Sequence, residues 1–267
     1  MFFTLILIVA LVGIVVGFVL SKKGDGRGSA IMTVAAILGM TVGMAHFFFR
    51  GKNPVDEHPI KVQEWHFASI AAQRMGVYLV EQQAATKALV VMPFELRTSN
   101  ERRKAMMDGL GKALGEKITV VKIVDPPMPP AVKTAYESRM NPDMEQQEIP
   151  DFTLWFTAAY FDRLLQENPG DYTLVISLAG LPEDAANMRC IREKRGLKFA
   201  TTFSPLFKLH PLMKDGHLIA DVQQHPSPNP EAEPPDDEAL IPSFDRRYLL
   251  ITPANMAELK QKYPDLF

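Results

Sequence analysis

Cysteine is almost absent from this chain, since Cys190 is the only one among 267 residues. A single thiol excludes an internal disulfide framework and a zinc site built on cysteine pairs. An excess of positive charge is lacking as well. Residues 53–267 hold 24 bases and 30 acids, so this part of the chain lacks the positive surface that nucleic-acid binding requires. We therefore predict no nucleic-acid partner.

Recognisable catalytic motifs are missing too. The chain contains no G-x-S-x-G, no G-x-G-x-x-G and no P-loop, and its histidines show no spacing for a zinc site. The glycines and lysine of residues 108–113 lie late in a predicted helix rather than directly after a strand, which is not a phosphate-binding context. We predict no catalytic residue, no metal ligand and no cofactor, and we favour a protein that is not an enzyme.

Two long apolar runs stand near the start of the chain. Phe2–Leu20 has no charge, and Ala30–Phe49 contains only His46 as a titratable residue. Because a hydrocarbon core about 30 Å thick needs roughly 20 apolar residues in a helix, each run is long enough to span it. A short polar link joins them, so residues 1–52 are predicted to form a two-helix transmembrane hairpin with the lipid bilayer as its partner.

A cleaved signal peptide is the alternative, but no positive segment precedes Phe2 and no A-x-A site follows Leu20. The link between the runs carries three basic residues, and none precedes the first run. This bias favours a cytoplasmic link. We therefore predict a two-span protein of the cell membrane whose soluble domain lies outside the cytoplasm.

Each apolar run contains a G-x-x-x-G pair, Gly13 with Gly17 and Gly39 with Gly43. Small residues four positions apart allow another helix to approach closely. The two pairs would close the hairpin on itself, or they would serve self-association or docking to a membrane-protein partner. Glycine is common in membrane helices, which favours the first interpretation.

A helix is expected in residues 53–86, between the membrane hairpin and the soluble part, because residues 61–85 have helical apolar spacing and no proline. Short apolar runs then alternate with helical stretches through residues 87–267. Runs rich in Val, Ile and Leu are typical of strands covered on both faces. The runs are Ala88–Met92, Ile118–Val124, Tyr172–Leu178, Lys198–Phe203, His217–Val222 and Tyr248–Thr252.

Two stretches between these runs, Asn100–Leu114 and Phe152–Gln166, have helical spacing. Thr98 with Glu101 forms a capping box for the first, and Asp151 is a cap for the second. The alternation of strands and helices predicts an α/β fold, a doubly wound and mostly parallel sheet with helices on both faces.

Two insertions interrupt this pattern. Residues 125–150 are rich in proline and polar residues, with a short helix expected at Val132–Arg139. Residues 225–242 hold six prolines and five acids, which predicts an exposed, extended loop. The loop is interpreted as a solvated connection, with docking of a partner as the alternative.

A family resemblance covers roughly residues 75–205. The segments Gly76–Val80, Lys87–Val91, Arg103–Leu110, Lys117–Val121, Asp171–Gly180 and Arg195–Thr202 carry it. In the order and length of these runs the chain resembles half of a type I periplasmic-binding-protein fold. The resemblance implies a receptor-like α/β lobe. The residues that follow are too few for the second lobe between which that family closes on its ligand.

Ligands of open α/β sheets bind beyond the carboxyl ends of the strands, at the point where the strand order reverses. The predicted strands place Arg97, Thr98, Ser99 and Ser204 there as candidate ligand-binding residues. The free N–H groups of a helix that begins after Thr98 and Ser99 would attract an anion, with Arg97 beside them. The alternative is that Thr98 only caps the helix and Arg97 is solvated.

Three functions remain open. The first is a non-catalytic binding or assembly subunit of a membrane complex, which the absence of catalytic motifs and the G-x-x-x-G pairs favour. The second is a receptor-like module that binds or senses a solute. The third is a membrane-bound α/β enzyme with an unfamiliar site.

Overall fold

The computed structural model describes residues 16, 18, 22, 33–34, 59–227 and 240–267. The chain divides into two units, Met1–Lys61 and Val62–Phe267, and the second contains the sheet. No helix within the described residues is long and apolar enough to cross a membrane. The two apolar runs, apart from isolated positions, and their G-x-x-x-G glycines lie outside the described residues. The transmembrane hairpin therefore stays a prediction.

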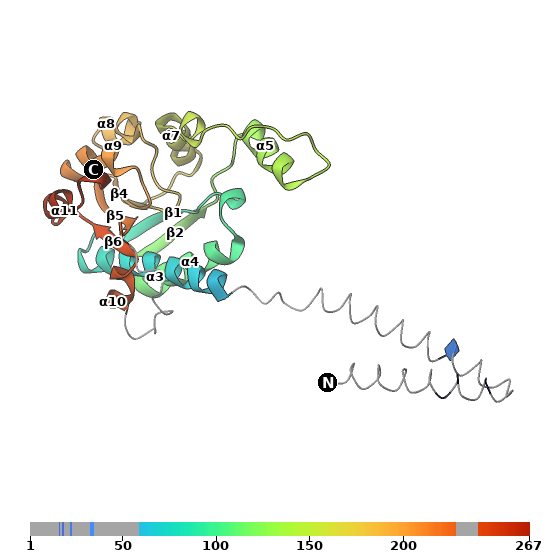
Figure 1. Cartoon of the computed structure of the whole chain (residues 1–267). Coiled ribbons are helices and arrows are strands. Elements are labelled where there is room, and N and C mark those ends of the chain that lie inside the picture. Colours follow the sequence, from blue (N-terminus) through green and yellow to red (C-terminus); the bar gives the residue numbers. More distant parts are fainter. Residues whose placement is uncertain (1–15, 17, 19–21, 23–32, 35–58, 228–239) are drawn as a thin grey trace. The chain divides into compact units, whose positions relative to one another are not determined.

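A six-stranded sheet forms the centre of the second unit (Figure 1), in the order β2-β1-β3-β4-β5-β6. The first five strands in this order are parallel, and β6 runs antiparallel to β5. The strands are β1 (Lys87–Val91), β2 (Thr119–Val124), β3 (Leu174–Ser177), β4 (Lys198–Thr202), β5 (Leu218–Gln224) and β6 (Tyr248–Ile251). All six coincide with predicted runs, and the mostly parallel α/β sheet is confirmed.

Helices cover both faces of the sheet (Figure 1). One face packs against α3 (Pro59–Glu81), α4 (Asn100–Leu114) and α10 (Leu240–Asp245). The other packs against α6 (Phe152–Trp155), α7 (Ala158–Glu167), α8 (Arg189–Arg192), α9 (Leu206–Lys214) and α11 (Met256–Lys262). The predicted short helix of the first insertion is α5 (Pro130–Met140), at the margin of these layers, and 3₁₀ turns lie at Glu95–Arg97 (η1), Ala185–Asn187 (η2) and Pro264–Leu266 (η3).

Strand β1 shows how the two cores are built. Ala88 and Val90 belong to the cluster under α3 and α4, whereas Leu89 and Val91 belong to the cluster on the opposite face. All four side chains are fully buried. Successive side chains of a strand point to opposite faces, so an uninterrupted apolar run is what a strand between two helix layers requires.

Helix α3 is part of this core rather than a separate element ahead of the domain. Phe67, Ala71, Met75 and Leu79 recur every four residues and are all fully buried. Amphipathic spacing indicates that one face of a helix is covered, but it does not indicate what covers that face. The position of α3 next to a membrane segment stays a prediction. Helix α3 packs so closely on α4 that only glycine fits at position 109, because a Cβ there would lie 2.1 Å from the Ser69 carbonyl oxygen.

Several local expectations differ from the structure. The cap of α4 is Ser99, whose hydroxyl accepts the Arg102 N–H, and not Thr98. The helix expected over Phe152–Gln166 breaks after Trp155, and Thr157 caps the new helix α7. The Asp151 cap is confirmed, since its carboxylate accepts the Thr153 N–H at 2.9 Å.

The second insertion is described only at its ends. Pro242 falls in the first turn of α10, where a missing N–H costs no helical hydrogen bond, so the predicted loop does not extend that far. Residues 228–239 lie outside the described residues, and their extended conformation stays a prediction.

Membership of α3 in the core predicts a large effect of Leu79→Ala. Removal of a fully buried leucine should lower the free energy of unfolding by about 2–5 kcal/mol, measured by urea denaturation. The control is Leu154→Ala, because that leucine is 75% exposed in α6 and its loss should change stability by less than about 0.5 kcal/mol. Equal effects of the two substitutions would contradict this placement of α3.

Candidate functional site

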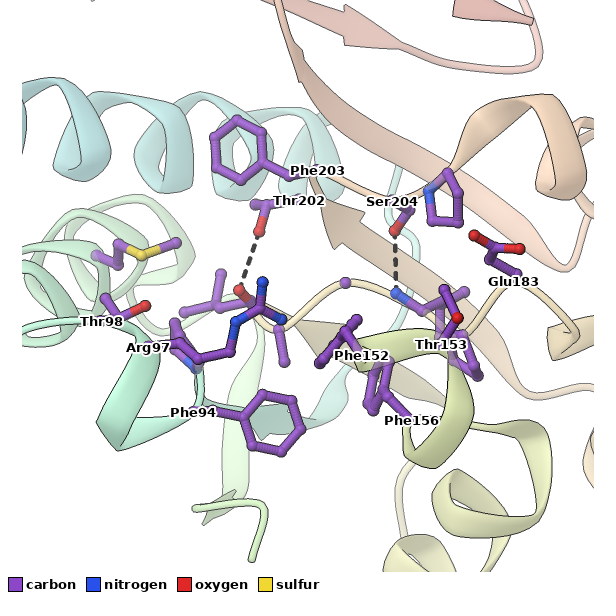
Figure 2. Close-up of a pocket in the computed structure, with 18 of the residues that line it drawn as sticks. Phe94, Arg97, Thr98, Phe152, Thr153, Phe156, Glu183, Thr202, Phe203 and Ser204 are labelled. Carbon is purple, nitrogen blue, oxygen red and sulfur yellow. Dashed lines mark hydrogen bonds between the residues drawn. The ribbon is translucent and has the colours of Figure 1, made fainter. Parts of the chain in front are cut away.

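A cleft of about 480 Å³ opens at the carboxyl ends of β1, β3 and β4 (Figure 2). From β1 the chain passes to β2 on one side, whereas from β3 it passes to β4 on the other side. The connections that follow β1 and β3 therefore run in opposite directions along the sheet. This is the switch point at which open α/β sheets bind ligands. The lining comprises Pro93, Phe94, Arg97, Thr98, Arg102, Met106, Phe152, Thr153, Phe156, residues 178–183 and residues 202–205.

Aromatic rings form one wall of the cleft. Phe94 follows β1, and its ring centroid lies 5.8 Å from that of Phe152 and 5.4 Å from that of Phe156. Phe152 and Phe156 stack with centroids 4.6 Å apart. The break between α6 and α7 places Phe156 in this cluster and leaves Phe152 partly exposed. The wall offers a ligand an apolar surface, chiefly that of Phe152, since Phe94 and Phe156 are buried.

The charged groups of the cleft come from different connections. Arg97 ends η1, and its guanidinium carbon lies 4.1 Å from the centre of the Phe152 ring. Arg102 belongs to the first turn of α4. Glu183 follows β3, and Figure 2 shows it on the opposite side of the pocket from Arg97 and Thr98. The cleft is therefore positive towards the β1–α4 connection and negative at its far side.

The structure brings three of the four predicted candidates together. Arg97, Thr98 and Ser204 all line the cleft. Ser99 does not, because its hydroxyl is used as the cap of α4. Ser204 is buried, and its hydroxyl oxygen accepts the Leu181 N–H at 3.0 Å. Ligand binding by these residues stays a prediction.

A chain of hydrogen bonds runs from the cleft into the sheet. The Ser204 hydroxyl donates to Thr201 Oγ1 at 2.8 Å, and the Thr201 hydroxyl donates to Asp221 Oδ1 at 2.5 Å. Gln223 Nε2 donates both to Asp221 Oδ2 and to the Ser204 carbonyl oxygen. Thr201 and Gln223 donate directly to Asp221, and the Ser204 hydroxyl is linked to it through Thr201. The carboxyl group therefore fixes the positions of Ser204 and of the backbone at Leu181, which form the floor of the cleft.

Asp221 is a residue that the sequence interpretation missed. It lies within β5 and is completely buried, and burial raises the pKa of its carboxyl group to about 7 against the lowering effect of the hydrogen bonds from Thr201 and Gln223. An acidic residue inside the predicted apolar run His217–Val222 was the available signal. Such a group is buried only where hydrogen bonds compensate its lost hydration.

Three non-glycine residues of the described chain have a positive φ, Gln83, Lys194 and Phe203, and the last of these lies at the same edge of the sheet. Phe203 follows β4 with φ of +56°, a conformation that costs a bulky residue free energy. Its N–H donates to the Val222 carbonyl oxygen at 2.7 Å, and its partly exposed ring lines the cleft. Strained residues of this kind are common at ligand sites.

Two nucleophilic side chains near the sheet, Cys190 and Ser177, are buried. Cys190 is buried, and burial raises the pKa of its thiol to about 11, so it is protonated at neutral pH. The buried Ser177 hydroxyl donates to the Gly180 carbonyl oxygen at 2.6 Å. No group of three or more His, Cys, Asp or Glu among the described residues is arranged to hold a metal ion.

Comparison with known proteins gives no family. No family model matches the chain, and no curated protein matches it. Solved structures that are similar include a glucose-galactose binding protein from Geobacillus stearothermophilus, with 14% identity, a TM-score of 0.40, and coverage of 71% of this chain and 61% of that protein. A galactofuranose binding protein has 13% identity, a TM-score of 0.40, and coverage of 74% and 63%.

A LacI-type transcriptional regulator from Bacteroides fragilis is also similar, with 9% identity, a TM-score of 0.37, and coverage of 70% and 61%. The chain spans less than two thirds of the length of each of these three proteins. The predicted resemblance to part of a type I periplasmic-binding-protein fold is confirmed to this extent. At such scores it says nothing about a ligand.

The buried Asp221 carboxyl predicts an unusual pH dependence of stability. Its pKa is about 7 in the folded protein and near 3.8 in the unfolded chain, so between these values the folded state binds more protons. The carboxyl group therefore adds most to the free energy of unfolding below pH 3.8. This added stability is lost as the pH rises to 7, by up to about 1.4 kcal/mol per pH unit.

The measurement is the free energy of unfolding of the wild type minus that of Asp221→Asn, taken at several pH values. This difference should decrease from pH 4 to pH 7, because the asparagine has no proton to lose. A difference that stays constant or increases over this range would show that the carboxyl group is not desolvated as described.

Strain at Phe203 is testable by two substitutions that both remove the ring. Phe203→Gly should be more stable than Phe203→Ala by about 0.5–1 kcal/mol, because glycine adopts a positive φ without steric cost. At the exposed Phe207, within α9, the order should be reversed, since glycine is a poor helix former. The same order at both positions, measured by thermal unfolding, would argue against strain.

Proposed function

We propose that residues 62–267 form a non-catalytic domain that binds a small solute, as a receptor-like or sensing module. The observation that carries this proposal is the cleft of about 480 Å³ at the reversal of strand order between β1 and β3. Its volume lies within the range of small-molecule sites, about 300–1,000 Å³. Its lining combines an apolar wall with a few polar groups, which is the usual composition of such sites.

Two features of the cleft support binding further. The hydrogen bonds around Asp221 hold the floor of the cleft in one arrangement. Binding of a ligand therefore costs little additional conformational entropy of the protein. Phe203, whose backbone is strained, adds an exposed aromatic ring to the lining of the cleft. Sugars and their derivatives serve as first probes, because their hydroxyl groups can form hydrogen bonds with the polar groups of the lining.

The predicted transmembrane hairpin extends this proposal. If residues 1–52 anchor the chain, the solute-binding domain is held at a membrane surface, where it would pass a ligand or a signal to a membrane partner. Only the two apolar runs support this part of the proposal.

Filling the cleft should abolish binding. Ala179 lines the cleft, and Ala179→Trp would occupy the space of the ligand. Ala159→Trp is the control, because Ala159 is exposed on α7 and does not line the cleft. Thermal unfolding of the full-length chain is measured with D-glucose, D-galactose, L-arabinose, D-gluconate and D-glucose 6-phosphate.

At 100 times its Kd, a ligand should stabilise the wild type and the control by about 2.7 kcal/mol, which raises Tm by several degrees, and should leave Ala179→Trp unchanged. Native mass spectrometry of the purified chain would detect a small molecule that co-purifies. The absence of a shift with every compound and of any co-purified molecule would contradict the proposal, as would an equal shift in Ala179→Trp.

A further inference from the structure

The cleft contains two guanidinium groups that form no salt bridge to an acid within the described residues. These belong to Arg97 and Arg102, on either side of the start of α4. Of the other described arginines, four pair with acids, Arg103 with Asp125, Arg189 and Arg195 with Glu193, and Arg247 with Glu64, whereas no salt bridge is formed by Arg74, Arg139, Arg163, Arg192 and Arg246. The positive charge of the cleft is therefore available to a ligand.

Arg97 is exposed, and its guanidinium group lies over the ring of Phe152. The guanidinium carbon lies 4.1 Å from the centre of the Phe152 ring, so the ring covers one face of the group. Stacking occupies the face of this planar group and leaves the N–H donors at its edge, which match the two oxygens of a carboxylate or phosphate. Because Phe152 also packs against Phe94 and Phe156, the stacking partner is itself fixed.

The opposite side of the cleft carries the only acidic side chain of the lining, Glu183. Two guanidinium groups against one carboxylate leave an excess of one positive charge. Aromatic walls of low polarity strengthen the field of such charges inside a cleft. A neutral ligand would displace water from both guanidinium groups without compensating their charge, which is unfavourable.

We propose that the solute is a small organic anion whose carboxylate or phosphate group binds Arg97 and Arg102, while the remainder of the molecule lies against Phe152 and Phe156. A hydroxyl or amino group at the other end of the ligand donates to Glu183. This inference rests on the proposed function and adds the chemical class of the ligand. It assigns Arg97 and Arg102 as the residues that determine specificity.

The test compares neutral and anionic forms of one sugar, D-glucose with D-gluconate and with D-glucose 6-phosphate, by calorimetric titration of the full-length chain. At least one anion should bind ten times or more tighter than D-glucose, and the two anions distinguish a carboxylate from a phosphate. Increasing KCl from 50 to 500 mM should weaken binding of the anion but not of D-glucose.

Neutral variants identify the residues. Arg97→Gln and Arg102→Gln should each weaken binding of the anion by about 10- to 100-fold, the usual cost of a lost charge-assisted hydrogen bond, and should change binding of D-glucose less than threefold. Arg97→Lys keeps the charge but not the planar fork, so it should restore part of the preference. The control is Arg192→Gln, an exposed position on α8 outside the cleft.

The outcomes separate the two proposals. If D-glucose binds as tightly as its anionic forms in a manner that Ala179→Trp abolishes, the cleft binds a solute but the anion inference is wrong. The inference is also wrong if Arg97→Gln and Arg102→Gln weaken neutral and anionic ligands equally. If Ala179→Trp leaves all binding intact, the cleft is not the site, and both proposals fail.

Discussion

Burial of parallel strands on both faces is the constraint from which the site follows. In β1, successive side chains enter two separate cores, so neither face of the strand is open to solvent. Parallel neighbours cannot be joined by a hairpin and need a crossover, and the crossovers bring all parallel carboxyl ends to one edge of the sheet. Where β2 and β3 lie on opposite sides of β1, the connections diverge and the cleft forms.

Rigidity at this edge comes from a polar group in an otherwise apolar layer. Asp221 costs free energy to bury, yet its two oxygens accept hydrogen bonds from Thr201 and Gln223 and orient the Ser204 hydroxyl. Phe203, next to these residues, keeps a strained backbone. A hydrogen-bonded network and a strained residue therefore lie side by side where the cleft opens.

The sequence predicted those elements whose signals come from residues close together in the chain. All six strands, helix α4 and the Asp151 cap follow from apolar runs, helical spacing and side chains close in sequence. The break before α7 was missed because the helical spacing continues through Phe156, whose burial among other aromatic rings is a contact between distant residues. Asp221 was missed for a related reason, since its partner Thr201 lies on β4, twenty residues away in the sequence.

Composition and periodicity alone determined that residues 87–267 alternate strands and helices, and that candidate binding residues follow β1 and β4. They also predicted two membrane spans, which the described residues do not test. Tertiary structure decided that α3 belongs to the core, that Ser99 serves as a cap while Arg97 lines a cleft, and that Ser204 is held by a buried carboxyl group. The physical reason is that periodicity records which side of an element is apolar, whereas the identity of its neighbour depends on how the strands are ordered in the sheet.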